Sequence, residues 1–149
     1  MVLTADRGRG KSSTLGIAAA QLLVERHGLD IIVTAPSVKA IEPVFSHAIQ
    51  RLEVIEVVNA THIRHQGGSL RFVAPDDLLK SKPECDLLLV DEAAAIPIPM
   101  LKSMVGIYHR MVFSTTVHGY EGSGRGFGIK FESWLSVHRP GWKLSLIHI

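Results

Sequence analysis

The sequence has little of several features that would narrow its class. One cysteine, Cys85, among 149 residues excludes an internal disulfide and a zinc site built on paired cysteines. No apolar run approaches the roughly 18 residues of a membrane-spanning helix. Neither charge sign dominates, since 16 Lys and Arg stand against 14 Asp and Glu, which permits contact with nucleotide or nucleic acid without demanding it. We therefore expect a cytoplasmic protein with no membrane partner.

Short apolar runs alternate with stretches at helical spacing along most of the chain. Strands are expected within residues 29–36, 69–75, 85–94 and 109–117, and helices follow most of them. The strands are apolar throughout rather than at every second residue, which is typical of a parallel sheet covered on both faces. Residues 53–69 stay undecided between a strand and turns. The pattern predicts a three-layer α/β fold with a mainly parallel sheet.

A glycine-rich segment, "TADRGRGKSST" at residues 4–14, has the composition of a phosphate-binding loop. Such a loop needs glycines that turn backbone N–H groups toward an anion, a lysine for the outer phosphates and a hydroxyl for Mg²⁺. Gly8, Gly10, Lys11 and Ser12 supply these in order. Ala5 stands where the general pattern has its first glycine, so the loop departs from that pattern at one position. The segment predicts a P-loop at the start of a helix.

The run "LLLVDEAA" supplies a second part of a nucleotide site. An apolar strand that ends in two carboxylates downstream of a P-loop places Asp91 to hold Mg²⁺, directly or through water. Glu92 would polarise the attacking water as general base. Taken alone, an Asp-Glu pair is more often a solvated helix cap. The order of the two motifs and the strand before the carboxylates favour the nucleotide site.

Hydroxyl side chains close the next strand, in "VFSTT". Ligands gather at the carboxyl ends of strands in open α/β sheets, so Thr115 and Thr116 are candidates to sense the γ-phosphate and to couple it to a partner. The alternative is that β-forming residues simply end a strand. In the glycine-rich stretch 118–130, Tyr120 is a candidate to stack on a base and Arg125 to contact a phosphate. A plain surface loop is the alternative there.

Other polar and aromatic residues carry weaker signals. His62 and His65 have a spacing that suits a metal, but no third ligand joins them, so we interpret both as surface histidines. Arg7 and Arg9 bind phosphate or RNA, or are solvated flanks of the loop. Trp134 is expected in the core or as a cap.

Four runs in this order, "LTADRGRGKSS", "VTAP", "LLLVDEAAAIPIPML" and "FSTTVHGYEGSGRGF", resemble the helicase-like ATPase module of the tRNA(Met) cytidine acetyltransferase family. The form A-x-x-G-x-G-K-[ST] of the loop is similar to that of nucleic-acid helicases. The resemblance implies a RecA-like P-loop NTPase that uses ATP, or GTP, with Mg²⁺, and it implies Lys11, Asp91 and Glu92 as catalytic residues and Ser12 and Asp91 as the Mg²⁺ site. It places the nucleotide contacts on Asp6, Arg7, Gly8, Arg9, Gly10, Lys11, Ser12 and Ser13.

The same resemblance implies partners. Members of the family couple NTP hydrolysis to an attached acetyltransferase domain, which moves an acetyl group from acetyl-CoA to N4 of the wobble cytidine of elongator methionine tRNA. No residue of this chain is assigned to acetyl-CoA. We expect a domain at 1–143, incomplete at both ends. The run "LSLIHI" at 144–149 matches one reading frame of a common sequencing adaptor and is expected to be a non-native tail. Two alternatives stay open, a free-standing P-loop helicase or ATPase and a nucleotide-dependent tRNA-binding module without turnover.

Overall fold

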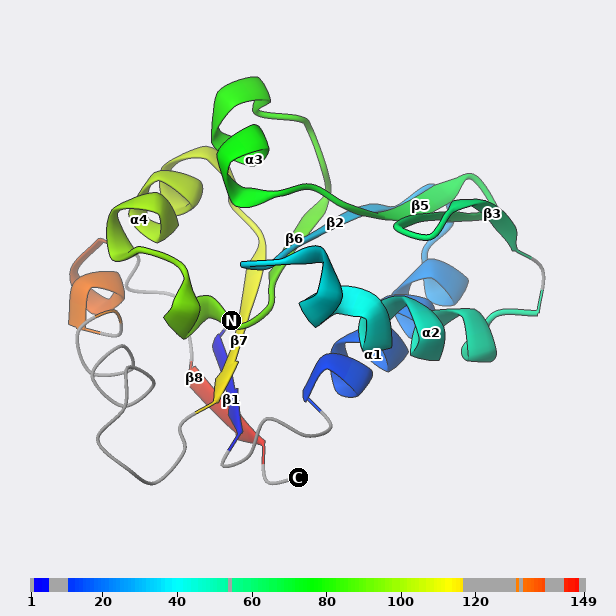
Figure 1. The fold of residues 1–149 in the computed structure, drawn as a ribbon, viewed down its shortest axis with the longest axis horizontal. Helices are drawn as coiled ribbons and strands as arrows, with labels where there is room; N and C mark the ends of the chain where they lie inside the picture. The colour runs from blue at the N-terminus through cyan, green and yellow to red at the C-terminus, as the bar shows by residue number, and fades with distance from the viewer. Residues whose placement is uncertain are drawn as a thin grey trace.

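A computed structural model of the chain describes residues 2–5, 11–53, 55–116, 131, 133–138 and 144–147, with the backbone alone at 2–5, 11, 116 and 144–147. These residues form an eight-stranded sheet in the order β3-β4-β5-β2-β6-β7-β1-β8 (Figure 1). The strands are β1 (Val2–Ala5), β2 (Asp30–Thr34), β3 (Glu56–Asn59), β4 (His62–His65), β5 (Gly68–Phe72), β6 (Leu87–Val90), β7 (Met111–Thr116) and β8 (Leu144–Ile147).

Six neighbouring strands of the sheet, from β5 to β8 in that order, run parallel. Thr34 lies opposite Val90, and Val90 lies opposite Phe113, so the carboxyl ends of β2, β6 and β7 meet at one edge. Buried side chains point to both faces of these strands, which is why their sequences are apolar without alternation. The predicted parallel sheet is confirmed.

Helices cover both faces of the parallel strands (Figure 1). On one face Ile31, Val33 and Leu70 pack with α1 and α2, and on the other Ile32 and Leu88 pack with α3, α4 and the helical residues 131 and 133–138. The three-layer prediction is therefore confirmed. Among the helices that the structure describes, none is long and apolar enough to cross a bilayer. The helices are α1 (Lys11–Glu25), α2 (Glu42–Arg51), α3 (Pro75–Ser81) and α4 (Ile98–Ile107).

Prolines begin three of these helices. Pro43, Pro75 and Pro99 each lie at the first or second position of a helix, where the missing N–H has no intrahelical acceptor to bond. Pro43 therefore starts α2 rather than interrupting a longer helix. Ser37 is the N-cap residue of a short 3₁₀ helix, η1 (Val38–Ile41), and makes no side-chain capping bond.

The undecided stretch at residues 53–69 folds as an antiparallel extension of the sheet through β3, β4 and the start of β5. Gln66 and Gly67 join β4 to β5 with φ values of 47° and 82°, the positive angles that a tight two-residue hairpin turn requires. Asn59 ends β3, and its side-chain oxygen accepts the amide N–H of Thr61 at 2.8 Å. The residues of the two turns, after β3 and between β4 and β5, therefore suffice to explain where the chain reverses.

The last described strand, β8, pairs in parallel with β1, with Val2 opposite Leu144. The origin of residues 144–149 as a non-native tail stays a prediction.

Candidate nucleotide-binding site

The predicted site lies at the edge of the sheet where β1, β7 and β6 end. β1 leads into residues 6–10, which lie outside the described part of the chain, so Asp6, Arg7, Gly8, Arg9 and Gly10 stay predictions. α1 then begins at Lys11, whose backbone alone is described, and its first turn carries Ser12 and Ser13. The predicted helix after the glycine-rich segment is confirmed, and β1 is a strand that sequence reasoning did not predict.

A hydrogen bond joins the two motifs that the sequence separates by 79 residues. The hydroxyl of Ser12 donates to Oδ2 of Asp91 at 2.6 Å. Asp91 is fully buried, and its backbone N–H donates to the carbonyl oxygen of Thr34 at 2.8 Å. The carboxylate is therefore held at a fixed place beside the first turn of α1.

The chain turns sharply directly after Asp91. Oδ1 of Asp91 accepts the backbone N–H of Glu92 at 3.0 Å, and Glu92 adopts a left-handed conformation with φ 52° and ψ 44°. A non-glycine residue in this region costs on the order of 1 kcal/mol. Strain of this kind persists where the surroundings dictate it, and here Asp91 itself holds the turn. Glu92 is half-buried and caps a 3₁₀ turn, η2 (Ala93–Ala95).

The hydroxyls of β7 reach the same turn. Thr115 is fully buried, and its Oγ1 accepts the backbone N–H of Ala94 at 3.1 Å. Ser114 is buried beside it, while the side chain of Thr116 lies outside the described part of the chain. The bond ties the end of β7 to the turn that carries Glu92, which gives Thr115 a contact through which the two segments can move together.

Thr34 is a residue of this edge that sequence reasoning did not single out. Its carbonyl positions Asp91, and its own hydroxyl is buried without a hydrogen-bond partner among the described residues. A buried hydroxyl without a partner costs about 1–3 kcal/mol. Thr34 could have been identified in the run "VTAP" as a polar residue at the end of an otherwise apolar strand.

The oxygen atoms of Ser12 and Asp91 are suitable ligands for Mg²⁺. Magnesium is held in such sites by one or two carboxylates or hydroxyls together with phosphate oxygens and water, and Ser12 and Asp91 supply one of each within hydrogen-bond distance. No group of three His, Cys, Asp or Glu side chains suitable for a metal occurs in the part of the chain that is described. The arrangement thus suits an ion that a bound nucleotide helps to coordinate.

Other predicted residues lie elsewhere or outside the described residues. Tyr120 and Arg125 belong to residues 117–130, which are not described. His62 is half-buried and His65 is only 6% exposed, so the interpretation of both as surface histidines is wrong for His65. Both lie on β4, away from Ser12 and Asp91.

Two further side chains, Trp134 and Cys85, are partly buried and pack against the core that α3 and α4 form. Trp134 stacks on Phe131 with ring centroids 5.8 Å apart and packs against the core, as predicted. Burial raises the pKa of the Cys85 thiol to about 11, which favours the protonated thiol at neutral pH.

Known proteins are similar to nearly the whole chain. Residues 2–147 match the model of the helicase domain of RNA cytidine acetyltransferase NAT10/TcmA. The chain is 57% identical over 140 residues to tRNA(Met) cytidine acetyltransferase TmcA of Vibrio cholerae, covering 94% of this chain and 20% of that protein. It is 50% identical over 143 residues to TmcA of Nitrosococcus halophilus, covering 96% of this chain and 19% of the relative. The chain therefore spans about a fifth of the length of these relatives.

Solved structures support the fold. The large terminase of the thermophilic bacteriophage D6E covers 99% of this chain with a TM-score of 0.70 at 12% identity, over 39% of the terminase. The same terminase in complex with ATP-gamma-S gives a TM-score of 0.69 over 38% of its chain. At this identity the likeness shows a shared P-loop ATPase fold and nothing about substrate. The match of residues 2–147 to the family model shows that the chain belongs to the RNA cytidine acetyltransferase NAT10/TcmA family and corresponds to its helicase domain.

Proposed function

We propose that this chain binds ATP, or GTP, with Mg²⁺ at the edge formed by β1, β6 and β7 and hydrolyses it to support acetylation of N4 of the wobble cytidine in elongator methionine tRNA. The hydrogen bond between Ser12 and Asp91 carries the proposal, because it unites the P-loop helix with the carboxylate strand. The relatives are named as tRNA(Met) cytidine acetyltransferases, and the D6E terminase was solved with ATP-gamma-S. Acetyl-CoA belongs to an acetyltransferase domain of the full-length protein, and a cytoplasmic location stays a prediction.

Each residue of the edge has a distinct task in this proposal. The N–H groups of residues 6–13 bind the phosphates, with Lys11 on the outer ones. Ser12 and Asp91 would hold Mg²⁺, which would neutralise charge on the phosphate oxygens. Glu92 accepts a proton from the attacking water. Thr115 acts on Glu92 through the N–H of Ala94 and is a positioning residue.

Hydrolysis by this chain alone is expected to be slow. In related enzymes an arginine from a second domain or protein accelerates phosphoryl transfer by on the order of a thousandfold or more. A single P-loop domain does not provide such an arginine in trans. Nucleotide affinity is therefore the primary measurement for the 149-residue chain, and tRNA-stimulated hydrolysis the measurement for a full-length protein that contains it.

The test compares two variants at the edge with two matched controls. Lys11→Ala is expected to lower affinity for a fluorescent ATP analogue about 10- to 100-fold, the range of charge-assisted hydrogen bonds, while Lys80→Ala, on an exposed side of α3, does not. Glu92→Gln is expected to lower hydrolysis by about 10²–10⁴ and to keep nucleotide binding, while Glu84→Gln keeps both.

The results of these measurements distinguish the proposed function from its alternatives. Unchanged affinity in Lys11→Ala contradicts the P-loop. Unchanged hydrolysis in Glu92→Gln contradicts the general base. Binding without turnover in the full-length protein favours the alternative, a nucleotide-dependent tRNA-binding module. Turnover in a full-length protein without an acetyltransferase domain favours a free-standing P-loop ATPase.

A further inference from the structure

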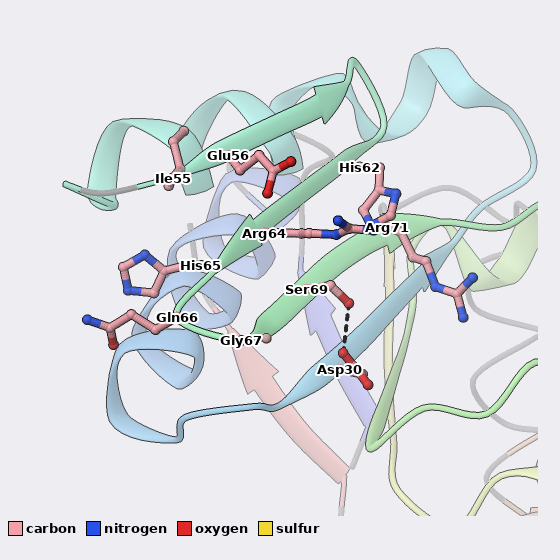
Figure 2. A pocket seen from close by; sticks show the side chains of 11 residues that line it. Asp30, Ile55, Glu56, His62, Arg64, His65, Gln66, Gly67, Ser69 and Arg71 are labelled. Carbon is pink, nitrogen blue, oxygen red and sulfur yellow. Dashed lines mark hydrogen bonds between the residues drawn. The ribbon is translucent and has the colours of Figure 1, made fainter.

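One face of the antiparallel extension carries polar side chains over a cavity. The helices α3 and α4 cover the face of the sheet that includes Ile32 and Leu88, and their core includes no described residue of β3, β4 or β5. Beyond β2 this face bears His62, Arg64, Ser69 and Arg71 around a cavity of about 630 Å³ (Figure 2). We call these four residues the polar face.

The strand register brings the polar face together. His62 lies opposite Arg71, and Arg64 lies opposite Ser69, across the antiparallel pair β4–β5. The two arginines are therefore diagonal neighbours on one face, at a separation of about 7–8 Å that long side chains can span. Figure 2 shows Arg64 and Arg71 extending from adjacent strands beside His62. Two guanidinium groups can thus act on one anion or on two successive ones.

The frame beneath the polar face is rigid. The amide of Ser69 donates to the carbonyl oxygen of Leu29 at 3.0 Å, and the Ser69 hydroxyl donates to Oδ1 of Asp30 at 2.9 Å. At Gly68 a Cβ would lie 2.6 Å from the same Leu29 oxygen, so the backbones of β5 and of the segment before β2 are in direct contact. The opposite face of the hairpin is anchored by Ile63, which is fully buried in the α1–α2 core.

Two arginines, Arg64 and Arg71, and two carboxylates, Glu56 and Asp30, line the cavity, and Oδ1 of Asp30 already accepts the Ser69 hydroxyl. Glu56 lies opposite Arg64 in the register. The pKa of His62 responds to the positive and negative charges around it. Its pKa is lowered chiefly by partial burial, then by Arg64 and Arg71, and Glu56 opposes them with the smallest effect. The arginines therefore outweigh the carboxylate at this position.

We propose that the polar face binds the phosphate backbone of RNA through Arg64 and Arg71. Arginine presents a planar set of donors that matches a phosphate with two hydrogen bonds, and the cavity leaves both side chains open to solvent. Protein interfaces are centred on buried apolar and aromatic side chains, and Ile55 is the one large apolar side chain among the described residues that line the cavity, which disfavours a protein partner. The choice of tRNA as the RNA rests on the proposed function.

This surface is distinct from the nucleotide edge. Asp30 and Gly68, which line the cavity, stand at the amino ends of β2 and β5, whereas Ser12 and Asp91 stand at the carboxyl edge of the parallel strands. Variants of one surface are therefore not expected to alter ligand contacts at the other. The two assignments can fail separately.

The first experiment measures binding of an elongator methionine tRNA transcript to the 149-residue chain across a salt series. Arg64→Ala with Arg71→Ala is expected to weaken binding about tenfold at 0.1 M salt and to reduce the slope of log affinity against log salt by roughly 1.4–1.8, since each phosphate contact contributes about 0.7–0.9. Arg51→Ala, a single charge change on exposed α2 across the sheet, is the control and is expected to keep the slope within about 1 of the parent.

Two variants guard against a folding artefact. Arg64→Lys with Arg71→Lys keeps both charges and is expected to retain most of the salt slope. Glu56→Gln removes the opposing carboxylate and is expected to strengthen tRNA binding about 1.5- to 5-fold, the scale of an exposed charge pair, a gain that misfolding does not produce.

The outcomes separate the two proposals. Loss of tRNA affinity in the double variant with unchanged ATP-analogue binding supports the polar face. Parental tRNA affinity and slope in the double variant overturn it and favour a protein partner. Failure of the parent chain to bind tRNA at about 50 mM salt, where phosphate contacts are strong, also overturns it. Loss of ATP-analogue binding in Ser12→Ala with unchanged tRNA affinity supports the nucleotide edge independently.

Discussion

The nucleotide edge and the polar face use polar residues in opposite ways. At the edge Ser12 donates to Asp91, and Asp91 and Thr115 each accept a backbone N–H of the following turn, at 2.6–3.1 Å. Asp91 and Thr115 are fully buried. On the polar face Arg64 is exposed and Arg71 half-exposed. Fixed, buried groups suit phosphoryl transfer because orientation there costs nothing at the moment of reaction. Accessible guanidinium groups suit a long, variable polyanion.

The largest effect is expected from Asp91→Ala. It leaves the Ser12 hydroxyl and the Glu92 N–H without their partner, so the free energy of unfolding should fall by about 1–3 kcal/mol, and Mg²⁺-dependent affinity for the ATP analogue should fall up to about 100-fold. Asp91→Asn keeps an acceptor and is expected to recover most of the stability but not the Mg²⁺ dependence. Denaturant titration and binding with and without EDTA measure the two effects. Equal loss of stability in both variants would contradict the assigned contacts.

A pair of helix glycines tests how the edge is positioned. Gly16 lies in α1, and a Cβ there would overlap the carbonyl oxygen of Val44 in α2, so Gly16→Ala should lower the free energy of unfolding by about 1–3 kcal/mol and disturb the first turn of α1. Gly106 lies in α4, where an added Cβ would meet no described atom within 4 Å. Gly106→Ala should raise the free energy of unfolding by about 0.5–1 kcal/mol. Denaturant titration measures both, and the same sign for the two substitutions would contradict the close α1–α2 contact.

Thr115→Val is expected to have a smaller effect. It keeps the shape of the side chain and removes the acceptor of the Ala94 N–H, which should lower stability by about 1 kcal/mol and hydrolysis about tenfold, equivalent to about 1.4 kcal/mol in the barrier. Nucleotide affinity should stay unchanged, because Thr115 acts through Glu92. Thr115→Ser restores the hydroxyl and should restore kcat. A change in affinity without a change in kcat would place Thr115 on the nucleotide instead.

The edge was predictable from sequence because local patterns mark it. A glycine-rich loop before a helix, and carboxylates after an apolar strand, lie at carboxyl ends of strands in any parallel sheet, so the meeting of Ser12 and Asp91 follows from topology. The order of the strands does not follow from these patterns, and Thr34 was missed because its role depends on which strand lies beside β6.

The polar face was much less predictable. All four residues of β3 are exposed, so its sequence lacks the alternation of apolar and polar residues that marks a half-buried strand. The sequence also gave no sign that one of the two histidines of β4, His65, is buried. The signals that define the extension are turn residues, Asn59 and the pair Gln66–Gly67. Such signals locate a hairpin, but they say nothing about which face of it stays uncovered, since that depends on where α3 and α4 end.

The smallest effect, on the pKa of His62, probes the charge of the polar face directly. Because Arg64 and Arg71 lower this pKa and Glu56 raises it, Arg64→Ala and Arg71→Ala should each raise it, whereas Glu56→Gln should lower it further. Phosphate bound at the arginines should also raise it, since a nearby anion favours the charged imidazole. Titration of the His62 ring by NMR, with and without the tRNA transcript, measures these shifts, and Arg51→Ala serves as the control. If none of the three variants moved the pKa, burial alone would set it, and the arginines would exert no measurable potential beside His62.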